Sequence, residues 1–168
     1  MKKSYLYLVT TFMLWGSLYV VSQFVLGKIP TFTVAMFRYL IAFIAISFIS
    51  LKSKKEKIEK SDYKYFFIMG FIGYFISVDC QLLGTKIAGG SMASLINSLN
   101  PIIISVMAMI ILNEKLEINK IIGIILSLFG VYMIIGTGAN IEFIGVLISF
   151  IAVIGWAFMS VISRKISN

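Results

Sequence analysis

The sequence predicts an all-α membrane protein with six transmembrane helices, on the basis of its composition, the clustering of its charges and the length of its apolar stretches. Hydrophobic residues make up 60% of the chain and charged residues only 13%, which is far from the composition of a soluble domain. The stretches between the charged clusters approach the roughly 20 residues that a bilayer-spanning helix needs. The predicted spans cover residues 5–26, 33–51, 65–84, 91–112, 120–137 and 143–163.

Basic residues fall on alternate loops between these spans, and this alternation predicts the orientation. Of the 15 Lys and Arg residues, twelve lie near the termini or in the loops after the second and fourth spans. Lys28 and Lys86 lie in the opposite set of loops, and Arg38 falls inside a span. We therefore expect a multi-pass protein of the plasma membrane with both termini in the cytoplasm. This topology explains the net charge of +8, so no nucleic-acid partner is predicted.

Residues for catalysis or metal binding are scarce. The chain has no His and a single Cys, Cys80, so a disulfide framework is excluded and a zinc site has almost no ligands. The spans hold no paired carboxylates and no Gly-rich phosphate loop of the Walker type. We expect no enzymatic activity, no cofactor and no metal, which leaves a membrane-embedded acyl- or phosphotransferase as a weak alternative.

Small residues form a stripe on each of two spans. They recur at steps of three and four at Gly70, Gly73, Ser77, Cys80 and Gly84 in the third span, and at Ser91, Ser94, Ser98, Pro101, Ser105 and Ala108 in the fourth. Such stripes let helix backbones approach each other closely in lipid. We expect both spans to pack closely, and packing against each other is one arrangement that would satisfy both.

Polar and aromatic side chains near the middle of the spans are candidates for a substrate cavity. They are Trp15, Tyr19, Asn97, Asn100 and Trp156. Their polar atoms need partners at that depth, and a cavity for a polar or zwitterionic substrate would supply them. The alternative is structural, namely buried aromatic packing and hydrogen bonds between helices. Pro101 removes a backbone hydrogen bond next to Asn100, which predicts a bend in the helix.

Two opposite charges lie at similar depth in neighbouring spans. Arg38 and Asp79 are each roughly 8 to 10 Å from the external end of their span, at 1.5 Å per helical residue. They are candidates for vestibule or gating charges, and Asp79 is the first candidate for proton coupling. The alternatives are a permanent ion pair, or extension of Arg38 to the membrane interface. Gln23 and Gln81, near the external ends, are interpreted as interfacial.

The first and last spans share a short pattern. Trp15, Val20 and Ser22 recur at the same spacing as Trp156, Val161 and Ser163. A repeat with a period of five spans reverses its direction in the membrane, because five is odd. Three matches can arise by chance. A true repeat with this period would be an inverted-topology repeat, a common construction of secondary transporters.

Several local motifs, taken in order, resemble the ten-helix EamA-type branch of the drug/metabolite transporter superfamily. The motifs are Leu14-Trp15-Gly16-Ser17, Phe37-Arg38-Tyr39, Ala93-Ser94-Leu95-Ile96, Asn100-Pro101, Asn113-Glu114-Lys115-Leu116, Gly155-Trp156-Ala157 and Ser163-Arg164-Lys165. The resemblance covers nearly the whole chain. Trp15, Arg38, Pro101 and Glu114 are the positions that match the family's pattern.

The resemblance implies two inverted five-helix repeats around a central cavity, and transport of metabolites such as amino acids, or of xenobiotics, often as export. Residues 1–138 would be the first repeat and residues 139–168 the first helix of an incomplete second repeat, so that four expected spans are absent. The partial bundle would contact the lipid bilayer and a small-molecule substrate. A complementary half-transporter or a second copy would close its cavity. The alternative is a non-transporting membrane fragment or an assembly subunit.

Overall fold

The computed structural model describes residues 2–51, 60–114, 118–135 and 142–167, which form helices joined by short turns and contain no strand. The elements are α1 (Lys2–Leu26), α2 (Thr31–Ser50), η1 (Lys60–Asp62), α3 (Tyr63–Ile68), η2 (Met69–Ile76), α4 (Ser77–Ala88), α5 (Gly90–Asn97), α6 (Asn100–Leu112), α7 (Ile118–Ile135) and α8 (Phe143–Ser167). The prediction of an all-α membrane protein is confirmed.

Five helical stretches are long and apolar enough to cross a membrane. They are Ser4–Leu26, Thr31–Ser50, Tyr63–Ala88, Gly90–Leu112 and Phe143–Ile166. The predicted span 120–137 corresponds to α7, whose apolar stretch among the described residues, Ile118–Gly130, is shorter than the others. Positions 136 and 137 of that predicted span lie outside the described residues.

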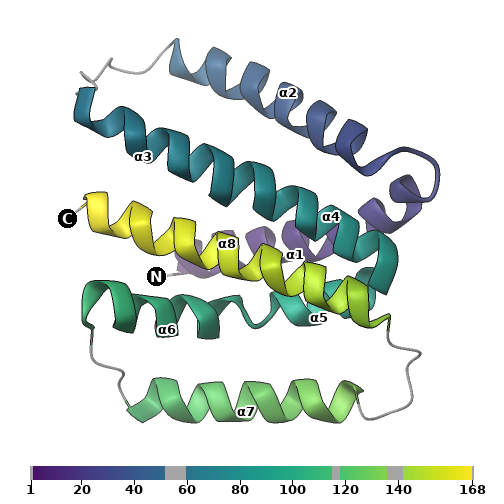
Figure 1. Cartoon of the computed structure of the whole chain (residues 1–168), viewed down its shortest axis with the longest axis vertical. Helices are drawn as coiled ribbons and strands as arrows, with labels where there is room; N and C mark the ends of the chain where they lie inside the picture. Colours follow the sequence, from purple (N-terminus) through teal and green to yellow (C-terminus); the bar gives the residue numbers. More distant parts are fainter. Residues whose placement is uncertain (1, 52–59, 115–117, 136–141, 168) are drawn as a thin grey trace.

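Consecutive spans run in opposite directions, and the two termini lie at the same end of the bundle (Figure 1). The third and fourth spans are joined by a very tight turn at Gly89. This residue has φ 84° and ψ 155°, a conformation that is strained for a residue with a side chain. Its carbonyl accepts the amide hydrogen of Ala93 and so starts α5 at once. The turn therefore holds α4 and α5 close together.

The third and fourth spans both depart from regular α-helix. The third contains a π-helical segment, η2, directly before Ser77, whose hydroxyl donates to the Ile72 carbonyl five residues earlier. The fourth is interrupted at Ser98 and Leu99, between α5 and α6, directly before Pro101. Because proline has no amide hydrogen, it fits the first turn of a new helix such as α6. Such irregular backbone within a membrane occurs where it is buried in protein or lines a cavity.

The last span, α8, lies at the centre of the bundle and packs against α4, η2, α5 and α6 (Figure 1). Glycines make this possible. A Cβ added at Gly84 would collide with Ser149, one at Gly145 with Ala88, and one at Gly155 with Ser77. The small-residue stripe of the third span therefore packs mainly against α8, and it meets the fourth span chiefly at the Gly89 turn.

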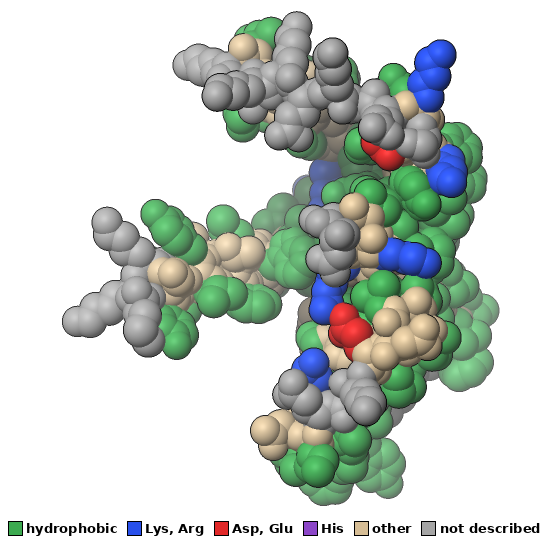
Figure 2. Space-filling view, turned by 90° about the vertical axis from the view of Figure 1, so that its left-hand side faces the viewer, with side chains coloured by type: hydrophobic (Ala, Val, Ile, Leu, Met, Phe, Trp, Pro, Cys, Tyr) green, Lys and Arg blue, Asp and Glu red, His purple; other side chains and the backbone are tan. Residues whose placement is uncertain are grey.

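Apolar side chains cover most of the outer surface, as expected for a chain in contact with lipid. Figure 2 looks onto the end that carries the termini, where Lys and Arg side chains gather between hydrophobic ones. At this end α1 projects away from the other helices, and its side chains from Ser4 to Ser17 are exposed. A buried hydrophobic cluster lies farther from this end and consists of Leu26, Ala35, Val78 and Leu82, while Val153 and Val161 of α8 are buried as well.

Candidate functional site

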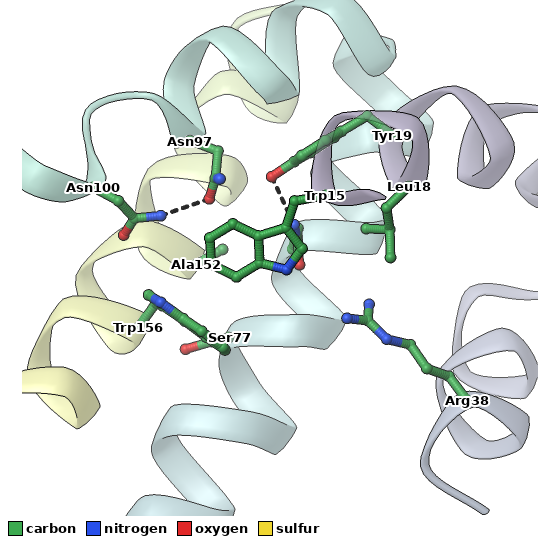
Figure 3. A pocket seen from close by; sticks show the side chains of 10 residues that line it. Trp15, Leu18, Tyr19, Arg38, Ser77, Asn97, Asn100, Ala152 and Trp156 are labelled. Carbon is green, nitrogen blue, oxygen red and sulfur yellow. Dashed lines mark hydrogen bonds between the residues drawn. The ribbon is translucent and has the colours of Figure 1, made fainter. Parts of the chain in front are cut away.

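A pocket opens in the middle of the bundle, and all five long apolar spans contribute to it (Figure 3). Its lining consists of Trp15, Leu18, Tyr19, Arg38, Ser77, Gln81, Asn97, Asn100, Ala152 and Trp156. The five side chains proposed from the sequence as cavity lining all line this pocket, together with Arg38. Three helices contribute pairs spaced four residues apart, which places both members of each pair on one helix face.

Aromatic rings form one wall of the pocket. Trp15 of α1 and Trp156 of α8 meet edge to face, with ring centroids 5.9 Å apart and an angle of 66° between planes. Tyr74 of η2 contacts Trp156 in the same manner at 6.0 Å. Edge-to-face pairs of this kind are favourable beyond the area they bury. The two tryptophans of the chain thus face the same cavity.

Tyr19 is almost fully buried, and its hydroxyl accepts a hydrogen bond from Nε2 of Gln81 at 2.6 Å. This bond joins α1 to α4 inside the pocket. The sequence predicts Gln81 near the external end of its span, and the structure adds that it lines the pocket. Gln23 is also engaged, since its Oε1 accepts the amide hydrogen of Gly90 at 3.1 Å. Both glutamines therefore connect helices.

Asn97 and Asn100 lie on either side of the interruption between α5 and α6. Nδ2 of Asn100 donates to Oδ1 of Asn97 at 2.6 Å, which links the two helices across the break. Asn100 is 8% exposed, and its own Oδ1 is buried without a partner in the described part of the chain. The pair therefore presents an unused acceptor and further amide hydrogens beside the aromatic wall.

Arg38 is the only charged residue among those that line the pocket. It follows the buried Thr31 and Ala35 at helical spacing, so it lies on the face of α2 that packs against the bundle. In Figure 3 its side chain extends from α2 toward the aromatic side chains. Next to it, the Tyr39 hydroxyl donates to the Tyr74 carbonyl at 2.8 Å and fixes α2 to η2. The Nη1 atom of Arg38 is buried without a partner among the described residues.

Asp79, which the sequence predicts at the depth of Arg38, is buried but does not line the pocket. Ser77 and Gln81 of the same helix do line it, and Asp79 lies between them in sequence. At about 100° per residue, a side chain midway between two that share a face points to the opposite side. Both carboxyl oxygens of Asp79 lack a partner in the described part of the chain. The ion pair that the described residues form is between Arg164 and Glu114, and Arg38 and Asp79 are not paired.

Sequence reasoning missed four lining residues: Leu18, Ser77, Gln81 and Ala152. A spacing signal was available for two of them. Gln81 follows Ser77 by four positions, and Ala152 precedes Trp156 by four. Lining residues on the first span show the same interval, between Trp15 and Tyr19. Leu18 carries no polar atom on its side chain, and only its position in the fold reveals it.

Comparison with known proteins identifies a family that matches most of the chain. The EamA-like transporter family matches residues 2–136. The chain is 27% identical to the uncharacterized transporter YetK of Bacillus subtilis, over 98% of this chain and 52% of that protein. It is also 27% identical to an uncharacterized transporter of Clostridium kluyveri, over 98% of this chain and 57% of the relative. The chain thus spans about half the length of these curated relatives.

The uncharacterized transporter YyaM of Bacillus subtilis is 30% identical over 67% of this chain and 38% of its own length. No solved structure matches the chain significantly. The matched family domain covers α1 to α7 and ends before α8. Together with the apolar spans and the pocket between them, this match shows that the chain belongs to the EamA-like transporter family.

Proposed function

We propose that this chain provides the substrate pocket of a secondary transporter for small metabolites, such as amino acids, or for xenobiotics, working in the direction of export. The observation that carries the proposal is the convergence of polar and aromatic side chains from five spans on one pocket. Polar groups inside a membrane are costly, and those that line a cavity commonly mark a substrate pathway. The proposed mechanism is alternating access, without covalent chemistry.

The proposed roles follow from the chemistry of each side chain. Trp15 and Trp156 contact the apolar part of the substrate, and Tyr19, Asn97 and Asn100 offer it hydrogen bonds. Arg38 and Asp79 act as vestibule or gating charges. The interruption before Pro101 leaves the fourth span loosely held at the depth of the pocket, where a rocking motion would need it.

The proposed orientation places both termini in the cytoplasm, in keeping with the basic residues at that end of the bundle. We further propose that residues 139–168 begin a second, inverted repeat. Two observations support this: α1 and α8 run in opposite directions in Figure 1, and their tryptophans meet in the pocket. A complementary half-transporter or a second copy of the chain would then close the cavity.

Flux through reconstituted vesicles tests the proposal. The chain is inserted alone, and together with the second half of a full-length relative. Efflux of labelled amino acids, of a labelled monocarboxylate and of a fluorescent dye is then measured. We expect saturable efflux that Asn100→Ala lowers by about tenfold, because a buried amide contact is lost. Asn119→Ala is the matched control, since Asn119 is exposed on α7 outside the pocket, and it should leave the flux unchanged.

Absence of efflux in both arrangements, or wild-type efflux in Asn100→Ala, would contradict the proposal. The first result would favour a non-transporting membrane fragment or an assembly subunit.

A further inference from the structure

The lining of the pocket carries one positive charge and no negative charge. Arg38 is the only charged residue among the ten that line it, and no carboxylate is among them. Nη1 of Arg38 is buried without a partner in the described part of the chain. Asp79, the buried carboxylate of α4, lies on the opposite face of that helix from the lining residues Ser77 and Gln81. It makes no ion pair with any described residue. The cationic group is thus left open toward the pocket.

A buried guanidinium hydrogen that lacks an acceptor is unfavourable, and more so in a membrane interior, where water cannot easily take its place. The planar guanidinium group matches a carboxylate especially well, because two parallel N–H groups can bind the two carboxylate oxygens. In Figure 3 the Arg38 side chain extends toward the indole rings. A ligand carboxylate at this position would therefore lie beside an apolar wall.

Two further groups of the pocket are available to a ligand. Tyr19 accepts a hydrogen bond from the Gln81 amide, and in this orientation its own O–H remains free to donate to another acceptor. Oδ1 of Asn100 is a buried acceptor without a partner among the described residues. Both are neutral, so neither compensates the charge of Arg38. An ammonium group in the pocket would find a neutral acceptor but no carboxylate.

On the basis of the proposed function, we propose that Arg38 anchors the carboxylate of the substrate, and that the pocket prefers a monocarboxylate anion with an apolar body to a zwitterion or a cation. A monocarboxylate neutralises the pocket. A zwitterion leaves one positive charge unbalanced, and a cation adds a second. Charge interactions are strong where water is scarce, so this difference should dominate over the small differences in hydrogen bonding.

Tryptophan fluorescence reports on this pocket directly, because both tryptophans of the chain line it. The chain is reconstituted in phosphatidylcholine vesicles, whose lipid supplies neither a carboxylate nor a tryptophan, and is titrated at neutral pH with four probes of similar shape. Isocaproate is an anion, isocaproamide is neutral, leucine is a zwitterion and leucinol is a cation. We expect a saturable change in fluorescence with isocaproate. Its half-saturating concentration should be about tenfold or more below that of each of the other three probes.

Variants of Arg38 identify the anchor. Arg38→Gln should weaken isocaproate binding by about tenfold or more and remove its advantage over isocaproamide. Arg38→Lys keeps the charge but loses the planar donor pair, so an intermediate loss is expected. Lys86→Gln is the matched control, because it removes a positive charge from an exposed position outside the pocket and should leave binding unchanged. Circular dichroism of each variant shows whether the helices are retained.

Two outcomes would overturn the inference, and they differ in what they say of the proposed function. Equal or tighter binding of leucine, leucinol or isocaproamide by the wild-type chain would refute the carboxylate anchor and leave a binding pocket in place. No saturable change with any probe would refute both the anchor and the pocket as a binding site. The wild-type comparison does not depend on the folding of any variant.

Discussion

The indole rings of Trp15 and Trp156 contact each other edge to face in the pocket, with 5.9 Å between their centroids. One belongs to the first span and the other to the last, and the two helices run in opposite directions (Figure 1). The short pattern shared by these spans in the sequence thus coincides with a direct contact in the fold. This contact holds α1, which is largely exposed, to the central helix α8.

Because of this contact, the effects of substituting the two tryptophans on stability should not be additive. In a double-mutant cycle of Trp15→Ala and Trp156→Ala, we expect a coupling of about 0.5 to 1.5 kcal/mol in the free energy of unfolding, as for other edge-to-face pairs. Unfolding by a denaturing detergent, followed by circular dichroism, measures it. Trp15→Phe keeps an aromatic ring and should retain most of the coupling. Simple additivity of the two alanine substitutions would show that the contact contributes nothing.

Close approach of α8 to α4 should make certain glycines intolerant of even a methyl group. A Cβ at Gly145 would come to 2.6 Å from the backbone nitrogen of Ala88, which cannot move aside like a flexible side chain. We expect Gly145→Ala to lower the free energy of unfolding by about 1 to 3 kcal/mol. At Gly123, on α7, an added Cβ meets nothing within 4 Å.

Gly123→Ala is therefore the control for Gly145→Ala. It should leave stability unchanged or raise it by up to about 1 kcal/mol, because alanine favours a helix more than glycine does. The same detergent titration measures both variants. Equal effects at the two positions would mean that α4 and α8 do not approach each other as closely as described.

The approximate limits of the five long apolar spans and five of the ten residues that line the pocket could be predicted from the sequence, because lipid imposes simple rules. Apolar length marks a span, and a polar group at mid-span needs a reason to be there. This rule predicts Trp15, Tyr19, Asn97, Asn100 and Trp156 as candidates, and all five line the pocket. Depth along the membrane is thus readable from a single chain.

The direction in which each side chain points around its helix was harder to predict. Arg38 and Asp79 match in depth, but one lines the pocket and the other faces away from it. Likewise, the depth of Gln81 along its span does not reveal its hydrogen bond to Tyr19. The sequence also does not specify which helix packs against the small-residue stripe of the third span, because several helices could pack there. These features depend on which helices are neighbours, and a single sequence does not specify that.

The ion pair between Arg164 and Glu114 should contribute little to stability, despite its short distance of 2.6 Å. The side chains are 55% and 36% exposed, so water and salt screen their attraction. We expect Glu114→Gln to lower the free energy of unfolding by less than about 1 kcal/mol, and the difference should vanish near 1 M salt. Unfolding at low and high salt measures this.

Arg164→Gln removes the other partner, and a double-mutant cycle with Glu114→Gln isolates the interaction between the two side chains. The coupling between the two substitutions should shrink as salt is added. If Glu114→Gln instead lowers the free energy of unfolding by several kcal/mol, and this loss persists at high salt, the ion pair contributes strongly to the packing of the end of α6 against α8.

We expect the buried Asp79 side chain to lower the free energy of unfolding. It is 9% exposed, and both its carboxyl oxygens lack a partner in the described part of the chain. A buried polar group without hydrogen bonds is costly, so Asp79→Leu should raise the free energy of unfolding by about 1 to 3 kcal/mol. Asp79→Asn keeps a polar group of the same size and should change it much less.

If Asp79 acts in gating or coupling, the same Asp79→Leu variant should transport more slowly than the wild type in the vesicle assay, although it is more stable. Measured together, stability and flux separate the two roles of the residue. A variant that is less stable than the wild type would show that Asp79 has a structural partner after all. A more stable variant with unchanged flux would exclude Asp79 from the transport mechanism.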